Sequence, residues 1–283
     1  MHNPDVSPTP QQPVLRLRPE SASARARLSE LWAYRELLLF LTWRDVQLRY
    51  RQTALGVAWA ILQPVLSMLV FSVFFGALGR MPSDGLPYPL FAYCGLLPWQ
   101  LFAFALTSSA SSLTANERLV TKVYFPRLIL PLSSVLAGLV DFAIAFVLLV
   151  PMLVAYGVRP GPALVWLPLF VLLALGAAIA VGLGLGALNV RYRDVRHALP
   201  FLTQLWLFVT PIAYPSSLVP ERYRALMGLN PMAGVVEGFR WAILGLPEPP
   251  LALLAVSSVM VLLGLVAGLA YFLRVERSFA DVI

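Results

Sequence analysis

The chain is 283 residues long; 59% of its residues are hydrophobic and only 12% are charged. Soluble domains carry about a quarter charged residues, so this composition excludes an ordinary soluble protein and predicts an all-α protein that crosses a membrane several times. A net charge of +7 would suggest a nucleic-acid partner in a soluble chain, but the positions of the basic residues explain it here without one.

The N-terminal part divides into a polar tail and a helix. Residues 1–28 are rich in Pro, Ser, Ala and Arg, which predicts a disordered cytoplasmic tail, and the first 30 residues hold no apolar run typical of a signal peptide. Residues 29–52 place Trp32 and Trp43 in an apolar stripe and Arg44 and Arg51 on another face. Tryptophan and arginine both favour the lipid headgroups, so we expect an amphipathic interface helix. A soluble helix packed on a partner subunit is the alternative.

Six apolar segments are each long enough to cross about 30 Å of hydrocarbon as a helix. They cover residues 55–78, 91–114, 128–157, 163–188, 197–214 and 251–273. Pro87, Pro89 and Pro98 predict a bent or partly re-entrant entry to the second span. Between the last two spans, residues 216–250 are too polar to cross and too apolar for an ordinary loop. We expect short helices at the outer leaflet there, with a plain extracytoplasmic loop as the alternative.

The basic residues orient the chain. If the N-terminus is cytoplasmic, sixteen of the 21 Lys and Arg residues fall on the inner side. The positive-inside rule therefore places both termini in the cytoplasm. The charged segment 116–131, between the second and third spans, is then cytoplasmic as well.

Several kinds of chemistry are missing from the sequence. Lys122 is the only lysine and no glycine-rich loop precedes it, so the chain lacks a P-loop for ATP hydrolysis. The spans hold one acid, Asp141, and no HExxH or CxxC motif, which argues against a membrane-embedded enzyme. An acid inside a membrane is a functional candidate by default; the structural alternative is that Ser133, Ser134 and neighbouring helices hydrogen-bond Asp141.

Aromatic residues recur along the first, second and fifth spans, and their rings can stack on sugars without a fixed site. The alternative for each ring is packing against lipid or a neighbouring helix. The candidate substrate path consists of Phe71, Phe74, Phe75, Trp99, Phe102, Trp206, Phe208 and Tyr214.

Several runs in this order resemble one family. They are the helix over 29–52, TALGVAWAILQPVL (53–66), GLLPWQLF (95–102), NERLVTKVYFPRLILPLSSVLAGLVDF (116–142), NVRYRDVRHALPFLTQLWLFVTPIAYP (189–215), NPMAGVVEGFRWAILG (230–245) and FADVI (279–283). Together they resemble the permease subunit of ABC-2 type exporters for cell-surface polysaccharides, over almost everything after residue 29. The KVYFPR and NPM runs are more similar to the O-antigen and teichoic-acid branch than to the capsule branch.

The resemblance implies a six-helix transmembrane domain over residues 53–283 in a bacterial inner membrane. Such permeases form homodimers and bind two copies of a separate ATPase, which would hold ATP and Mg²⁺, so no cofactor is expected on this chain. The implied function is export of a lipid-linked polysaccharide, most similar to O-antigen, from cytoplasm to periplasm. The alternatives are an ABC-2 exporter of teichoic acid, capsule polymer, lipid or drug, and a membrane-embedded glycan-modifying enzyme.

The resemblance also implies roles for particular residues. The ATPase-coupling segment would comprise Asn116, Glu117, Arg118, Lys122, Phe125, Pro126 and Arg127. The interface helix would act through Trp32, Trp43, Arg44, Arg49 and Arg51. The extracytoplasmic gate helices would include Glu237, Arg240 and Trp241. Arginine pairs well with pyrophosphate oxygens, so Arg191, Arg193 and Arg196 are candidate head-group contacts, although the positive-inside rule alone also explains them.

Overall fold

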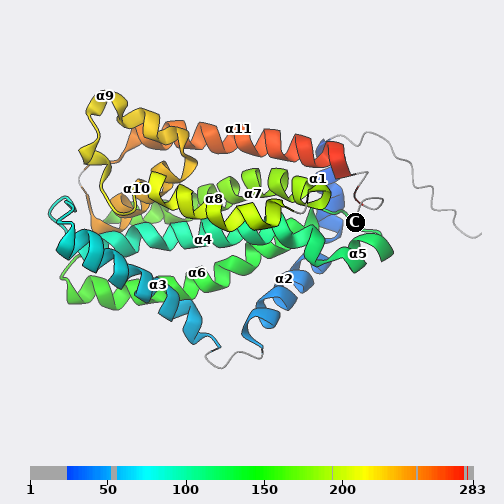
Figure 1. Cartoon of the computed structure of the whole chain (residues 1–283), viewed down its shortest axis with the longest axis horizontal. Coiled ribbons are helices and arrows are strands. Elements are labelled where there is room, and N and C mark those ends of the chain that lie inside the picture. Colours follow the sequence, from blue (N-terminus) through cyan, green and yellow to red (C-terminus); the bar gives the residue numbers. More distant parts are fainter. Residues whose placement is uncertain (1–23, 52–55, 193, 247, 277–278, 280–283) are drawn as a thin grey trace, which may run out of the picture.

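The computed structural model describes residues 24–51, 56–192, 194–246, 248–276 and 279; the regular secondary structure in these residues is all helical, with no β-strand. Five helices in this part are long and apolar enough to cross a membrane. They are α3 with its π-helical continuation η1 (Ala58–Phe71, Ser72–Leu78), α4 (Tyr88–Ala115), α6 (Ile129–Ala155), η2 with α7 (Pro162–Trp166, Leu167–Arg191) and α11 (Leu251–Val275). α4, α6, α7 and α11 run side by side along the long axis of the bundle (Figure 1).

The two ends of the bundle carry different segments. α1 (Ala24–Ala33), the short α5 (Glu117–Lys122) and the end of α11 lie at one end, whereas α9 (Glu221–Arg224) lies at the other (Figure 1). The segments that the sequence predicts to be cytoplasmic therefore share one end, and those predicted to be extracytoplasmic share the opposite end.

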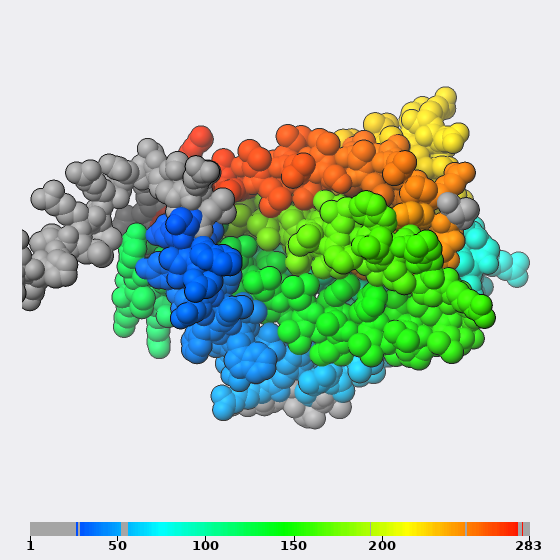
Figure 2. Space-filling view, turned by 180° about the vertical axis from the view of Figure 1, so that it is seen from behind, coloured from blue at the N-terminus to red at the C-terminus, as the bar shows by residue number. Residues whose placement is uncertain are grey.

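The predicted interface helix is two helices, α1 and α2 (Arg35–Tyr50), separated at Tyr34. The first begins at Ala24, before the expected boundary at residue 29. α2 packs on α6 through Leu41 and Val46, while Trp32 and Trp43 are exposed. Figure 2 shows α1 and α2, in blue, on the outside of the bundle. The predicted stripe thus splits into an outward aromatic part and an inward apolar part.

α4 is the central helix and packs on α7, α6, α10 and α3. The expected re-entrant entry is wrong, because α4 is one continuous helix of 28 residues from Tyr88. Pro87 caps it and Pro89 lies in its first turn, where no backbone N–H is needed. Small residues let α7 approach α4 closely. A Cβ added at Gly182 of α7 would lie only 2.7 Å from the Ser109 hydroxyl of α4.

The fifth predicted span is not a full spanning helix. α8 (Val195–Val209) has 15 residues, about 22 Å at 1.5 Å per residue, which is short of the roughly 30 Å of hydrocarbon. It ends at Thr210 because the residue before a proline disfavours the helical conformation. The chain then continues without helix through residues 210–215.

Residues 216–250 form a series of short elements rather than a plain loop. η3 (Ser216–Leu218), α9 and η4 (Ala225–Leu229) precede α10 (Pro231–Leu244), whose N-terminus is capped by the Asn230 side chain. Twelve of the fourteen residues of α10 are buried, against α11, α4 and α7. α10 is therefore part of the protein core and not a surface helix.

Candidate functional site

Uncharged polar side chains from three helices gather along one side of α4. They line a cavity of about 550 Å³ together with Phe71, Trp99 and Phe104, and none of the described residues that line it is charged. The polar members are Gln63 and Ser67 of α3, Gln100 and Thr107 of α4, and Thr203 and Gln204 of α8. We call this cavity the neutral groove. Hydroxyl and amide groups at membrane depth are costly without partners, so such a lining suits a polar, uncharged occupant.

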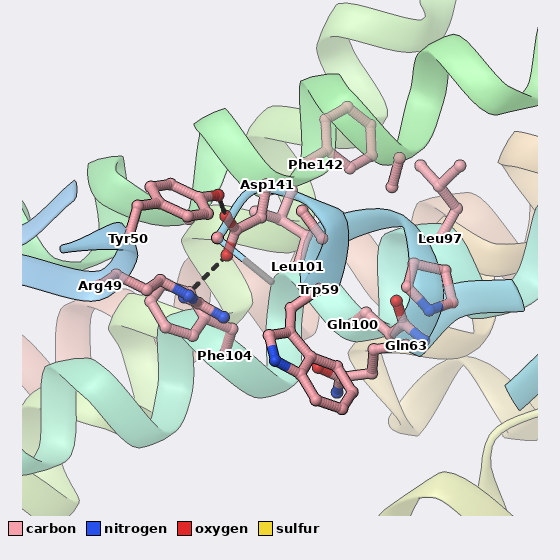
Figure 3. Close-up of a pocket in the computed structure, with 15 residues that line it drawn as sticks. Arg49, Tyr50, Trp59, Gln63, Leu97, Gln100, Leu101, Phe104, Asp141 and Phe142 are labelled. Atoms are coloured by element: carbon pink, nitrogen blue, oxygen red, sulfur yellow. Dashed lines mark hydrogen bonds and ion pairs between the residues drawn. The ribbon is translucent and has the colours of Figure 1, made fainter. Parts of the chain in front are cut away.

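A second cavity, of about 250 Å³, lies between α2, α3, α4 and α6 (Figure 3). It shares Gln63, Gln100 and Phe104 with the neutral groove, so the two cavities are adjacent. At its α2 side, Arg49 Nη1 lies 2.7 Å from Asp141 Oδ2, and the Tyr50 hydroxyl donates to Asp141 Oδ1. The Arg49 guanidinium also lies over the Phe104 ring at 4.0 Å. Because the carboxylate and the guanidinium are paired, this cavity has no excess charge.

Asp141 thus has its partners on a neighbouring helix, α2, as the structural alternative allowed, and not on the two serines. Ser133 donates to the Leu130 carbonyl and Ser134 to Asp45, so neither serine satisfies Asp141. Burial, the hydrogen bond to Asp141 and its charge together raise the pKa of Tyr50, which keeps the phenol protonated as a donor. Asp141 therefore fixes the end of α2 against α6.

A third cavity, of about 400 Å³, continues toward the end of the bundle that carries α5. It is lined by Asp45, Arg49, four serines and Asn116, and again by Phe104. Arg44 Nη2 donates to the Asn116 amide oxygen at 2.9 Å, which links α2 to the start of α5. Phe104 thus borders all three cavities, and a polar surface extends from Asn116 to Gln204.

Of the eight predicted path aromatics, Phe71 and Trp99 line the neutral groove. Phe75 packs on Phe71 at 5.2 Å, while Phe74 and Phe208 are exposed on the outside of the helices.

The remaining path aromatics hold the fold together. Phe102 is fully buried and stacks edge-on against Trp206 at 5.0 Å. Trp206 Nε1 donates to Asn230, the residue that caps α10, and the Tyr214 hydroxyl donates to the Val209 carbonyl. Phe102, Trp206 and Tyr214 therefore make contacts within the fold, which was the alternative to a role in the substrate path.

The predicted coupling segment is mostly exposed. Glu117, Arg118 and Lys122 face outward from α5. Phe125 does not: it is 6% exposed and packs in a cluster with Leu41, Val120 and Phe279. Its neighbour Tyr124 is 69% exposed and was missed by the sequence analysis.

The residues that end the coupling segment are anchored. Pro126 is half-buried, and Arg127 Nη1 donates to the Glu276 carbonyl at 2.7 Å. Burial raises the pKa of Glu276, against the opposing effects of Arg127 and Arg27. The segment is therefore fastened at one end to α2, through Asn116, and at the other to the end of α11.

The predicted gate residues Glu237 and Arg240 lie in the core. Arg240, 1% exposed, donates to the carbonyls of Pro211 (2.6 Å) and Ile212 (2.7 Å) and forms an ion pair with Glu237 at 2.9 Å. Its guanidinium also lies 3.5 Å from the centre of the Phe91 ring. Arg240 thereby supplies hydrogen bonds to the non-helical chain after α8, which has no helical partners of its own. Trp241 is half-buried and packs on Phe170.

Arg191 and Arg196, two of the predicted head-group arginines, line none of these cavities. Arg191 is exposed and stacks on Tyr192, and Arg196 is exposed on α8. Arg193 lies outside the described residues. Among the described residues, no group of three His, Cys, Asp or Glu could hold a metal ion.

A profile of the family described as ABC-2 type transporter matches residues 36–244, which include α2, the three cavities and α10. The chain belongs to the ABC-2 type transporter family. This membership confirms the resemblance found in the sequence.

Named relatives within the ABC-2 family are similar over most of their length. The O-antigen export system permease protein RfbA of Myxococcus xanthus is 38% identical over 260 residues, covering 90% of this chain and 98% of that protein. An RfbA of Klebsiella pneumoniae is 28% identical over 253 residues (88% and 95%). The polysialic acid transport protein KpsM of Escherichia coli is 25% identical over 216 residues (73% and 80%). These identities agree with the branch that the KVYFPR and NPM runs indicated.

Trp59, Gln63 and Gln100, which the cavities bring together, were not among the residues predicted from the sequence. A signal was present, since Gln63 and Gln100 are uncharged polar residues inside otherwise apolar spans, where each amide needs a partner.

Proposed function

We propose that this chain is the permease subunit of an ATP-driven ABC-2 exporter that moves a lipid-linked cell-surface polysaccharide, of the O-antigen class, across the inner membrane. The observation that carries the proposal is the neutral groove. It occurs in a chain whose relatives are named as O-antigen export permeases. Amides, hydroxyls and aromatic rings suit a hydroxyl-rich polymer, and the absence of charge in the lining suits neither a free ion nor a charged drug.

Energy for transport would come from a separate ATPase subunit that binds ATP and Mg²⁺. Support comes from the absence of a P-loop in the sequence and from α5, which exposes Glu117, Arg118 and Lys122 together with Tyr124 at one end of the bundle. We propose this face as the coupling surface. Arg44 and Arg127 would pass its movement to α2 and α11.

The assembly would be a homodimer with six crossings per chain and both termini cytoplasmic. α8 and residues 210–215 together support a sixth crossing, because Ala213 accepts a hydrogen bond from Tyr88, at the far end of α4 from α5. Leu199 is the one buried residue that the structure gives to α8, which leaves its Phe201, Leu205 and Phe208 open to a second copy.

Deleting the gene should abolish surface polysaccharide while lipid-linked polymer accumulates inside the cell, and the wild-type chain should restore export. Trp99→Ala should lower surface polymer at matched expression, because Trp99 lines the neutral groove. Normal surface polymer in the deletion strain would overturn the proposed function.

Coupling can be tested separately in the purified complex. Tyr124→Ala and Glu117→Arg should lower polymer-stimulated ATPase activity while the permease stays folded, because both side chains are exposed. Phe125→Ala should instead destabilise the permease by about 3–5 kcal/mol, the usual cost of truncating a buried phenylalanine. Wild-type coupling in both exposed variants would contradict the assigned surface.

A further inference from the structure

The cavity between α2, α3, α4 and α6 contains two side-chain amides with no partner. Gln63 projects from α3 and Gln100 from α4, and both line this cavity and the neutral groove (Figure 3). Neither amide makes a hydrogen bond to another described residue. Each amide offers two donors and an acceptor, and leaving them unpaired at membrane depth is costly. The arrangement therefore calls for an occupant that both donates and accepts.

Aromatic faces stand beside these amides. Trp59 is 48% exposed and lies between the glutamines and the Arg49–Asp141 pair (Figure 3). Phe104 also lines the cavity; the Arg49 guanidinium lies over its ring at 4.0 Å, and a Cβ at Gly138 would come within 2.6 Å of the ring. An apolar ring face next to amide and carboxylate groups matches a pyranose, which has C–H faces and hydroxyl edges.

The charge balance and the size narrow the choice of occupant. Arg49 and Asp141 neutralise one another, so the site has no net positive charge to attract a phosphate. A lipid tail would leave both amides unsatisfied. The volume of about 250 Å³ is below the roughly 300–1,000 Å³ of sites for drug-sized ligands, which suits one sugar ring rather than several.

We propose that Gln63 and Gln100 form a subsite for a single neutral sugar ring, stacked on Trp59 and bordered by Phe104, at the inner end of the polymer path. The proposal rests on the proposed function and adds a defined contact point to it. The subsite lies between the serine-lined cavity near α5 and the neutral groove, so a polymer passing from one to the other would meet it.

Occupancy can be measured with a thiol reporter in the reconstituted permease–ATPase complex. Cys94 is buried and is the single cysteine of the chain, so Cys94→Ala with Ala60→Cys places one reactive thiol in the cavity lining. The probes are delipidated oligosaccharide of the host's own surface polymer, and inorganic pyrophosphate. We expect the oligosaccharide to protect the thiol from a small maleimide, and pyrophosphate to leave it reactive.

Adding Gln63→Leu and Gln100→Leu should raise the oligosaccharide concentration for half protection about tenfold, the effect of losing two ordinary hydrogen bonds. Gln47→Leu is the matched control, because Gln47 is exposed on α2 and lines none of the three cavities. Protection by pyrophosphate instead of oligosaccharide, no protection by either, or protection unaffected by the double substitution would overturn the subsite.

Measuring export in cells distinguishes a failure of the sugar subsite from a failure of the proposed export function. In a strain where gene deletion abolishes surface polymer, Gln63→Leu with Gln100→Leu should reduce export at matched amounts of assembled complex. Normal export by that variant would overturn the subsite and leave the proposed function standing, whereas normal export after deletion would overturn the proposed function.

Discussion

Two regions of the molecule place polar groups at membrane depth in opposite ways. Around α10, Arg240 and Glu237 are paired, and Arg240 also donates to the carbonyls of the chain after α8. Along α4, Gln63 and Gln100 have no partner among the described residues and face cavities. The first region is closed and satisfied, and the second is open and unsatisfied.

The presence or absence of partners distinguishes polar groups that stabilise the fold from those that we propose bind a ligand. A buried charge persists only when it is paired and hydrogen-bonded, so Arg240 belongs to the structure although an arginine in a membrane protein first suggests function. The glutamines carry no charge and draw less attention, yet their unpaired amides mark the functional side of α4.

The largest effect is expected from Arg240→Met. It leaves Glu237 buried without its ion-pair partner and removes the donors to Pro211 and Ile212, so we expect a loss of about 3–5 kcal/mol. Thermal unfolding of the purified permease measures this loss. Arg222→Met is the control, since Arg222 is exposed on α9 and should change the melting temperature little. Equal melting temperatures for the two variants would contradict the claim that Arg240 stabilises the closed region.

A smaller effect is expected from crowding the packing around Phe104, which borders the cavities of the open region. Gly138→Ala puts a Cβ 2.6 Å from the Phe104 ring, and overpacking of this kind costs about 1–3 kcal/mol. The displaced ring should also change maleimide access to the thiol introduced by Ala60→Cys. Gly184→Ala, with no described atom within 4 Å of the new Cβ, is the matched control. Unchanged stability and access in Gly138→Ala would contradict the position of Phe104.

The smallest effect on stability is expected from Asp141→Asn. The pair with Arg49 is partly solvated, because the Arg49 side chain is 39% exposed, so its loss should cost about 1 kcal/mol or less. A double-mutant cycle with Arg49→Gln measures the pairwise term. A coupling energy as large as that of Arg240 with Glu237 would place Asp141 in the closed region instead.

The sequence predicted the long helices well because about 20 consecutive apolar residues leave little choice of structure. Four predicted spans coincide closely with α4, α6, α7 and α11, and the first with α3 and η1. The fifth predicted span is not a full spanning helix, because the length of an apolar segment does not show where the helix within it ends. Residues 210–215 remain in the core without helix because Arg240, about thirty residues later in sequence, supplies their hydrogen bonds.

The candidate site was harder to predict because its contacts are distant in sequence. Tyr50 and Asp141 are 91 residues apart, and no local pattern pairs them. Tyr124 and Phe125 are adjacent aromatics, and only the packing of α1, α2 and α11 determines that Phe125 turns inward. Residue type could nominate both, but only the fold shows that Tyr124 is the exposed one of the two.

The cluster that buries Phe125 also holds Phe279, stacked on Phe272 at 5.3 Å. Leu41, near the start of the chain, belongs to the same cluster. A growing chain on the ribosome therefore cannot complete this cluster until Phe279 has emerged, although its earlier helices have already entered the membrane. The support beneath α5 therefore matures only after residues far apart in sequence have met, so a partner that bound the proposed coupling surface would bind only after Phe279 is in place.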